Sequence, residues 1–144
     1  MVEEPRRQRS ETLRQAHREL LDLLESMSPQ LVPSQLQRDA KHARAMLSML
    51  AGKLTIHLAM EDNALYPRLA AHNNQDVRKL AEKFDREMGG ILGAFKQYLG
   101  RWPTALAIQA DGAGFVDETR QIFAALRTRI AKEDAELFPR LDEC

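Results

Sequence analysis

Four segments of the sequence carry apolar residues at alternating steps of three and four, and this spacing constrains the fold more than any other feature. Residues at these steps share one face of an α-helix, so each segment predicts an amphipathic helix with one inward stripe. In the second segment the stripe is Leu36, Ala40, Ala43, Leu47, Leu50, Leu54, His57 and Glu61. The other stripes are Leu13, Leu20, Leu24 and Met27, then Ala81, Asp85, Met88, Leu92, Phe95 and Leu99, and finally Phe115, Thr119, Ile122, Leu126, Arg129 and Glu133.

Polar residues between these segments indicate where the helices begin. Ser34, followed three residues later by Gln37, has the pattern of a capping box and predicts the start of the second helix. Asn74 or Asp76 is expected to cap the third helix. The glycine-rich residues 111–114 are expected to form a turn before the fourth helix.

The length of the chain allows one core. With 144 residues, a hydrophobic share of 44% and a charged share of 29%, the sequence has the size and composition of one globular domain. Four helices with one apolar stripe each bury those stripes by packing around a common axis. We therefore expect an all-α fold, an antiparallel up-down-up-down four-helix bundle, as a single domain over residues 1–144. Residues 1–9 are expected to be a disordered tail.

Charge and cysteine usage exclude several classes of protein. Lys and Arg number 21 and so do Asp and Glu, so no net positive field favours nucleic acid. Charges interrupt every apolar run before the roughly 18 residues that a membrane span needs. Cys144 is the only cysteine, which excludes an internal disulfide. With no secretory signal at the N-terminus, we expect a cytoplasmic protein that binds neither membrane nor nucleic acid.

The second and fourth segments repeat each other. At an offset of 72 residues, residues 54–69 align with residues 126–141, and eight positions are identical. At an offset of 68, His17 aligns with Asp85. The chain therefore reads as two related helix pairs, and we expect a pseudo-two-fold axis in the bundle.

The repeat also superposes the polar residues of the stripes. His57 and Glu61 are four apart, so an imidazole and a carboxylate share one helix face, as in metal sites of helical bundles. With Glu61, Asp85 and Glu133 inside and only Arg129 opposing them, the interior charge is about −2. Two arrangements can balance it. One is a divalent cation held by these side chains, and the other is a salt network of protonated histidines with the guanidinium.

The run that begins at His57, His-Leu-Ala-Met-Glu-Asp-Asn-Ala-Leu-Tyr-Pro, resembles the second-helix motif of the hemerythrin-like, HHE cation-binding family. In that family the motif carries an iron-ligating histidine and a bridging glutamate, the positions of His57 and Glu61. His17 resembles the first-helix histidine. The resemblance extends from about Leu13 over almost the whole chain and implies a metal-binding helical bundle.

The third and fourth segments depart from the family pattern. Asp85 stands where a third-helix histidine is expected, and Arg129 replaces the fourth-helix histidine, although Asp134 keeps the acidic residue five positions later. A two-iron oxygen carrier, which needs about five histidines, is therefore not expected. The metal-ligand candidates are His17, His57, Glu61, Asp85, Glu133 and Asp134.

Two functions follow from this pattern. The first is a cation-binding module with one divalent ion, iron above others, that acts as a sensor or store for iron, oxygen, nitric oxide or redox state. The alternative is a metal-free regulatory bundle that acts by protein–protein interaction, with Arg129 in place of the cation. The sequence has no Ser-His-Asp order, phosphate loop or Cys pair, so catalysis is the least favoured role. Whether the protein is an enzyme is left open by the sequence.

Overall fold

The computed structural model describes residues 9–144, and all its regular elements are helices. No β-strand occurs in this range, which confirms the all-α prediction. The expected tail lies outside the described residues except for its last member, Arg9. The elements are α1 (Glu11–Met27), the short 3-10 turn η1 (Ser28–Gln30), α2 (Pro33–Ala64), α3 (Tyr66–Ala70), α4 (Gln75–Arg101), α5 (Ala105–Ala110), α6 (Gly112–Lys132), the π-helix η2 (Glu133–Leu137) and α7 (Phe138–Asp142).

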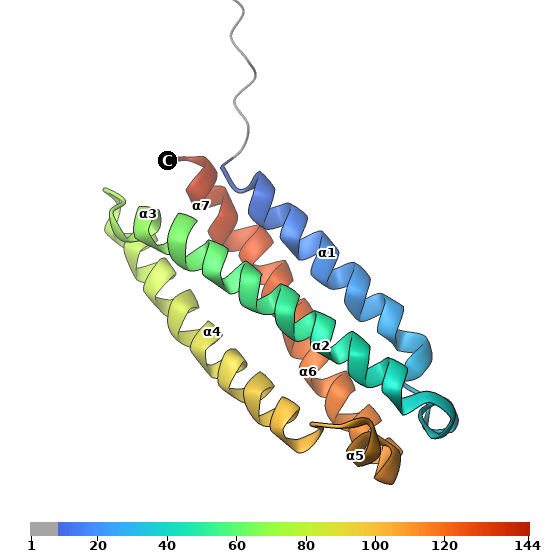
Figure 1. Cartoon of the computed structure of the whole chain (residues 1–144). Coiled ribbons are helices and arrows are strands. Elements are labelled where there is room, and N and C mark those ends of the chain that lie inside the picture. Colours follow the sequence, from blue (N-terminus) through green and yellow to red (C-terminus); the bar gives the residue numbers. More distant parts are fainter. Residues whose placement is uncertain (1–8) are drawn as a thin grey trace, which may run out of the picture.

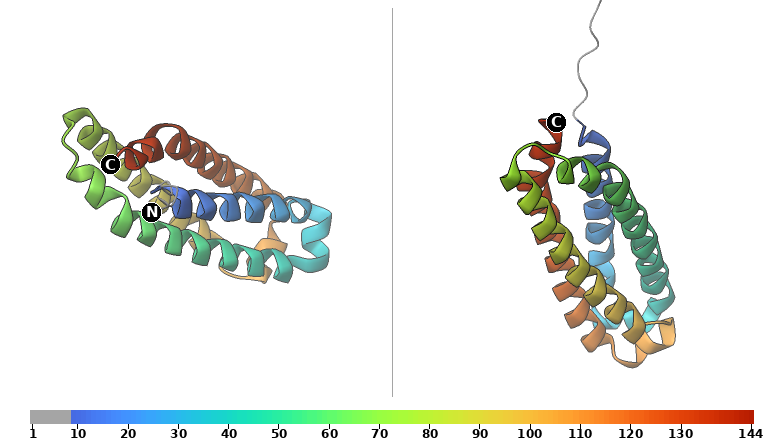
Figure 2. Two further views of the ribbon diagram at one scale, coloured as in Figure 1. Left: turned by 90° about the horizontal axis from the view of Figure 1, so that it is seen from above. Right: turned by 90° about the vertical axis from the view of Figure 1, so that its left-hand side faces the viewer.

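The four long helices α1, α2, α4 and α6 form a helical bundle (Figure 1). Helix α1 packs on α2, α4 packs on α6, and α2 also contacts α6. The first described residues and the C-terminus lie at the same end of the bundle (Figure 2), where Nε of Arg9 donates a hydrogen bond to the carbonyl of Cys144 at 2.9 Å. The pseudo-two-fold relation between the helix pairs stays a prediction.

Helix α2 begins at a proline and bends six residues later. Val32 precedes Pro33 and makes no side-chain cap, so the predicted capping box is wrong and Ser34 lies inside the helix. Proline starts the helix here because its fixed φ suits the first helical position. Asp39 leaves the helical conformation, with φ −151° and ψ 67°, and accepts a hydrogen bond from the backbone N–H of His42 at 3.1 Å. Asp39 therefore caps the long straight part of α2.

The caps of α4 and α6 agree only in part with those predicted from the sequence. Asn74 accepts a hydrogen bond from the backbone N–H of Asp76 at 2.9 Å, which confirms Asn74 as the N-cap of α4. Asp111 accepts one from the N–H of Gly114 at 3.0 Å and caps α6 in the same way. The turn predicted over residues 111–114 is therefore wrong, because the aspartate side chain satisfies one of the free backbone donors at the helix N-terminus and the helix starts at Gly112.

The buried stripe of helix α4 differs from the predicted one by one residue at two of its turns. Asp85 is exposed, and the aromatic rings at the neighbouring position 84 and at position 98 are buried instead. The two stripes share Ala81, Met88 and Phe95, so the periodicity fits both. Burying large aromatic rings is favourable and burying a carboxylate is costly, which decides the helix rotation. The buried residues of α4 are Val77, Ala81, Phe84, Met88, Phe95 and Tyr98.

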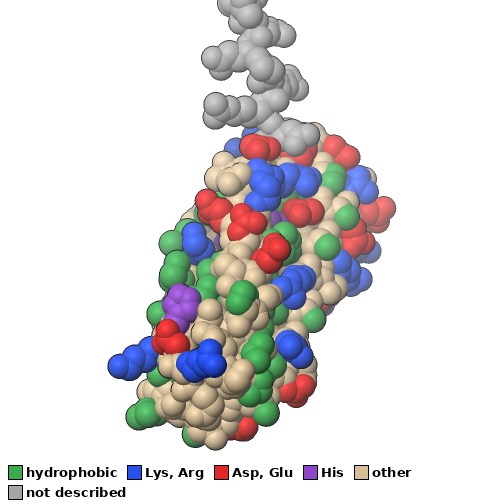
Figure 3. All heavy atoms as spheres, turned by 90° about the vertical axis from the view of Figure 1, so that its right-hand side faces the viewer, with side chains coloured by type: hydrophobic (Ala, Val, Ile, Leu, Met, Phe, Trp, Pro, Cys, Tyr) green, Lys and Arg blue, Asp and Glu red, His purple; other side chains and the backbone are tan. Residues whose placement is uncertain are grey.

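The surface carries charges of both signs. Figure 3 shows acidic and basic side chains mixed with hydrophobic ones on the face that it presents. None of the helices in residues 9–144 is long and apolar enough to cross a membrane.

The buried apolar side chains form two clusters, and a polar layer separates them. On α1 the order is Leu13 of one cluster, His17, then Leu20 of the other. On α2, His57 and Glu61 follow residues of the larger cluster and precede Leu65 of the smaller one. The helices thus hold the same polar layer at one height of the bundle.

Candidate metal centre

The polar layer consists of five side chains that water hardly reaches. Their residues are between 0% and 4% exposed, although three of the five, the two glutamates and the arginine, belong to types that are rarely buried fully without a partner. They are His17 on α1, His57 and Glu61 on α2, Arg129 on α6, and Glu133, the first residue of η2.

Two imidazoles and two carboxylates of this layer converge on one point. Nε2 of His17 lies 3.0 Å from Oε1 of Glu133 and 3.9 Å from Oε1 of Glu61. Nε2 of His57 lies 2.5 Å from Oε1 of Glu61 and 4.0 Å from Oε1 of Glu133. One ligand atom from each of the four residues lies within 4.8 Å of the others. Together these four side chains could hold one small metal ion.

Several of these atoms have no hydrogen-bond partner within residues 9–144. They are both ring nitrogens of His57, both carboxylate oxygens of Glu61 and Oε2 of Glu133. Nε2 of His57 and Oε1 of Glu61 are close, but their geometry is not that of a hydrogen bond, so this contact leaves both atoms without a hydrogen-bond partner. A buried polar atom without a partner costs about 1–3 kcal/mol.

The same residues line a cavity of about 20 Å³, which has room for one water-sized species. Nitrogen and carboxylate donors together suit a transition-metal ion such as iron or zinc. The unpartnered atoms, their convergence and the size of the cavity therefore fit one bound cation.

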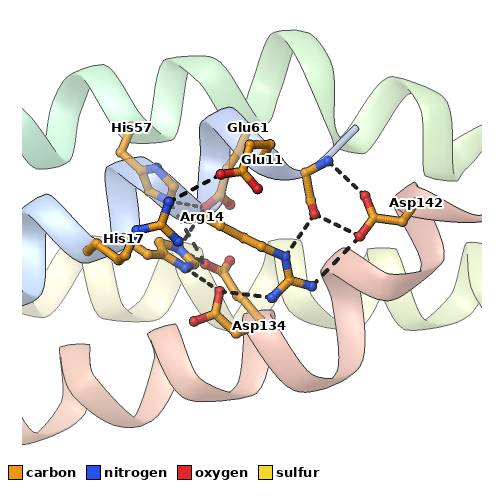
Figure 4. Close-up of polar contacts among 10 residues, drawn as sticks. Glu11, Arg14, His17, His57, Glu61, Asp134 and Asp142 are labelled. Carbon is orange, nitrogen blue, oxygen red and sulfur yellow. Dashed lines mark hydrogen bonds and ion pairs between the residues drawn. The ribbon is translucent and has the colours of Figure 1, made fainter. Parts of the chain in front are cut away.

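Asp134 supports the centre from its rim. Its Oδ1 lies 2.8 Å from Nδ1 of His17, and its side chain is 35% exposed (Figure 4). A carboxylate on the outer ring nitrogen fixes the histidine so that Nε2 faces the interior, as in many metal sites. The π-helix η2 carries this pair of carboxylates, with Glu133 turned inward and Asp134 beside it. π-helical turns are frequent at functional sites.

A hydrogen-bond network links His17 to both ends of the described chain (Figure 4). Asp142 accepts hydrogen bonds from the backbone N–H and the hydroxyl of Ser10, each at 2.8 Å. Arg14 donates to the hydroxyl of Ser10 and lies 3.8 Å from Asp142. The ring of Phe138 stacks on His17 with centroids 4.8 Å apart. These contacts hold the imidazole in one position.

Arg129 closes the other side of the cluster. Its Nε lies 3.4 Å from Oε2 of Glu133, and its Nη1 lies 3.7 Å from Glu87. Its Nη2 donates to the carbonyl of Phe84, and the guanidinium sits 4.4 Å from the centre of the Phe84 ring. Helix α4 thus holds a permanent positive charge against one of the buried carboxylates.

The buried charge is smaller than predicted. Two interior carboxylates face one guanidinium, which leaves one negative charge, because Asp85 is not among them. Burial lowers the pKa of His57, but the neighbouring carboxylates of Glu133 and Glu61 outweigh this effect and raise it to about 9. Without an ion, a proton on His57 balances the cluster.

The two carboxylates respond to their surroundings in opposite directions. Burial raises the pKa of Glu61 to about 6, against the effect of His57. Burial also raises the pKa of Glu133, but the hydrogen bonds and charges of His17 and His57 have the larger effect and lower this pKa to about 2. Glu133 therefore stays charged in the ion-free protein, and Glu61 is the more easily protonated of the two.

The structure brings together four of the six candidate ligands. His17, His57, Glu61 and Glu133 share the cluster, and Asp134 contacts it through His17. Asp85 lies apart on the surface, where it borders a pocket of about 370 Å³ together with Tyr66. Its expected place in the interior is wrong.

Two features of the site escaped the sequence reasoning. Arg14 lies 3.9 Å from Asp134, and the hydroxyl of Tyr66 is buried with no hydrogen-bond partner among the described residues. Burial raises the pKa of that hydroxyl. Nothing in the sequence marks the contact between Arg14 and Asp134, which lie far apart in the chain, or the burial of the Tyr66 hydroxyl.

Comparison with known protein families gives a match over nearly the whole chain. No curated protein and no solved structure matches the chain. The family described as the hemerythrin HHE cation binding domain matches residues 8–141, which is nearly the whole chain and includes every residue of the cluster. On this match and the buried His and Glu cluster, the chain belongs to the hemerythrin HHE cation-binding domain family.

Proposed function

We propose that this protein binds one divalent cation between His17, His57, Glu61 and Glu133 and acts as a sensor or store for iron, oxygen, nitric oxide or redox state. The observation that carries the proposal is the convergence of four ligand atoms within 4.8 Å, several of them buried without a hydrogen-bond partner. Among residues 9–144, side-chain contacts leave Nε2 of His57 and the oxygens of Glu61 unpaired, and an ion at this point would satisfy them.

Each residue has a distinct part in this proposal. His17 and His57 would bind through imidazole nitrogen, and Glu61 and Glu133 through carboxylate oxygen. Asp134 would keep His17 oriented. Iron suits this mixed donor set, and when bound it would supply redox chemistry and a Lewis acid at that point. The apolar clusters on both sides exclude water from the layer.

Arg129 argues for one ion and against two. Its guanidinium occupies the side of the cluster next to Glu133, and a second cation there would meet a fixed positive charge. The two buried carboxylates and the guanidinium together carry one negative charge when the histidines are neutral, so one divalent ion brings the layer to +1 and a second would bring it to +3.

Metal content tests the proposal directly. The protein, stripped with a chelator and offered Fe(II), Mn(II) and Zn(II) without oxygen, is expected to retain about one ion per chain by elemental analysis. His57→Ala should lose it, and His42→Ala, which changes an exposed histidine, should keep it. If the wild-type protein retains no more metal than His57→Ala, the proposal is wrong.

A second candidate is a metal-free regulatory bundle that acts on a protein partner inside the cell. The contact between Arg129 and Glu133 favours it, because a guanidinium and a protonated His57 balance the carboxylates with no ion. Thermal unfolding separates the two functions. A ligand that binds the folded state raises its stability, so added metal shifts the midpoint for the first candidate and leaves it unchanged for the second.

A further inference from the structure

The hydroxyl group of Tyr66 is a buried polar group that has no role in the metal centre as described so far. Tyr66 is the first residue of α3, and its ring packs on the smaller apolar cluster, which bounds the polar layer on one side. The hydroxyl oxygen is buried and has no hydrogen-bond partner in the described part of the chain. A buried tyrosine hydroxyl usually has a partner, because an unpaired buried donor is costly.

The contacts of α4 place this hydroxyl on the side of the layer that Arg129 occupies. Tyr66 lines a pocket together with Ala81 and Asp85, which lie on the turn of α4 that also carries Phe84. The carbonyl of Phe84 accepts a hydrogen bond from Nη2 of Arg129, and its ring lies under the guanidinium. Tyr66 and the guanidinium therefore pack against the same turn of α4.

The charges that act on the hydroxyl agree with this position. Burial raises the pKa of Tyr66, and the carboxylates of Glu61 and Glu133 raise it further, whereas the guanidinium of Arg129 has the opposite effect. Such charges shift a pKa mainly at short range, so the hydroxyl lies beside these three members of the layer. Because it keeps its proton, it is available as a hydrogen-bond donor.

The internal repeat shows what is particular to Tyr66. At the offset of 72 residues its counterpart is Phe138, and each of the two precedes a proline. Phe138 stacks on His17 with ring centroids 4.8 Å apart, so it supports one of the proposed ligands. An aromatic ring thus fills this position beside the layer in both halves of the chain, and only Tyr66 adds a donor.

The unpaired atoms of the layer leave one acceptor for this donor. Nε2 of His57 and Oε1 of Glu61 belong to the proposed ion site. Nε of Arg129 and Oε2 of Glu133 lie 3.4 Å apart and need only a small shift to pair. Besides Nδ1 of His57, the second oxygen of Glu61 and the hydroxyl of Tyr66 then remain. A cation cannot satisfy a donor, whereas a carboxylate oxygen can.

We propose that Tyr66 is a positioning residue of the metal centre, and that its hydroxyl donates a hydrogen bond to the Glu61 oxygen that does not bind the ion. This bond fixes the orientation of the carboxylate, as the contact from Asp134 fixes His17. Loss of such an outer contact typically weakens metal binding about 10- to 100-fold. The inference rests on the proposed function, because it concerns a ligand of the proposed ion.

Zinc affinity tests the inference. Tyr66→Phe removes one oxygen atom and keeps the ring, so the zinc dissociation constant, measured by competition with a chromophoric chelator, is expected to rise about 10- to 100-fold. Tyr98→Phe is the matched control, because the hydroxyl of Tyr98 pairs with Oγ1 of Thr119 at 2.5 Å and its ring lies in the larger apolar cluster. This control should leave the zinc affinity unchanged. If Tyr66→Phe binds zinc as tightly as the wild type, the inference alone is wrong, whereas a wild-type protein that binds no zinc overturns the proposed function as well.

Urea denaturation with a chelator present separates a positioning role from a role in folding. Without an ion the hydroxyl of Tyr66 has no partner among the described residues, so Tyr66→Phe should leave the urea midpoint unchanged or raise it. Tyr98→Phe should lower the midpoint, because it leaves the buried hydroxyl of Thr119 without its partner. A midpoint that falls as far in Tyr66→Phe as in Tyr98→Phe would mean that the hydroxyl stabilises the ion-free fold, and the inference is then wrong.

Near-ultraviolet difference absorption reports the hydrogen bond itself, since zinc does not absorb there and a phenol that donates to a carboxylate absorbs at a longer wavelength. Addition of zinc is expected to shift the tyrosine band to longer wavelength in the wild-type protein and in Tyr98→Phe, and to leave it in place in Tyr66→Phe. A wild-type spectrum without this shift, or a shift that persists in Tyr66→Phe, overturns the inference.

Discussion

Replacement of Arg129 by methionine tests whether the guanidinium balances the buried carboxylates. Methionine keeps much of the side-chain length and loses the charge, so Glu133, which is 2% exposed, loses its guanidinium partner and stays buried. Removing one partner of a buried ion pair costs about 3–5 kcal/mol. We expect about 3 kcal/mol, the lower end, because His17 still contacts Glu133 at 3.0 Å. The contact to Glu87 adds little, since that side chain is 38% exposed.

The measurement is urea denaturation followed by far-ultraviolet circular dichroism, with a chelator present so that no ion replaces the lost charge. Arg127→Met is the matched control, because Arg127 lies on the same helix, is exposed and contacts the ring of Phe123 at 6.0 Å. It should cost about 0.5 kcal/mol. If Arg129→Met lowers the free energy of unfolding no more than this control, the guanidinium does not balance the cluster and the reasoning is refuted.

Three further predictions follow from the site and the fold. Cation affinity should rise about tenfold per pH unit from pH 6 to pH 9, because His57, with a pKa of about 9 without an ion, must lose its proton on binding. Calorimetric titration at several pH values checks this, and an affinity that does not change with pH contradicts it. Asp134→Asn should weaken cation binding about 10- to 100-fold by loosening His17, while Asp62→Asn, its counterpart in the repeat, should leave the affinity unchanged. Asn74→Ala should lower the free energy of unfolding by about 1 kcal/mol, measured by thermal unfolding, because it removes the N-cap of α4. Asn73→Ala is the control, and an equal effect of the two substitutions would show that the cap contributes nothing.

The sequence predicted α2 and the ligand pair on it well, because many stripe positions lie on one long helix. All eight predicted stripe residues of α2 are buried, including His57 and Glu61. A shift by one residue would have placed charged or polar side chains such as Lys41 and Thr55 in the core, so only one rotation of the helix was acceptable. The resemblance to the HHE family rested on the same run, and the family match confirms it.

Helix α4 was predicted less well because its sequence allows two rotations. Phe84 and Asp85 are adjacent, and the alignment of Asp85 with His17 favoured the wrong one. Only the packing of four helices together decides between them, since Phe84 is buried under the guanidinium of Arg129. The predicted start of α2 is wrong for a local reason, because Pro33 and Ser34 both suit a helix N-terminus and the capping-box pattern favoured Ser34.

X-ray absorption at the metal edge of ion-loaded protein tests the central claim most directly, because it reports which atoms surround the ion. With zinc as the ion, ligation by the buried cluster predicts two imidazole ligands at about 2.0–2.1 Å together with carboxylate oxygens, and His17→Ala should reduce the imidazoles to one. An oxygen-only shell that does not change in His17→Ala would place the ion on surface carboxylates and contradict the assignment of His17, His57, Glu61 and Glu133 as one metal centre.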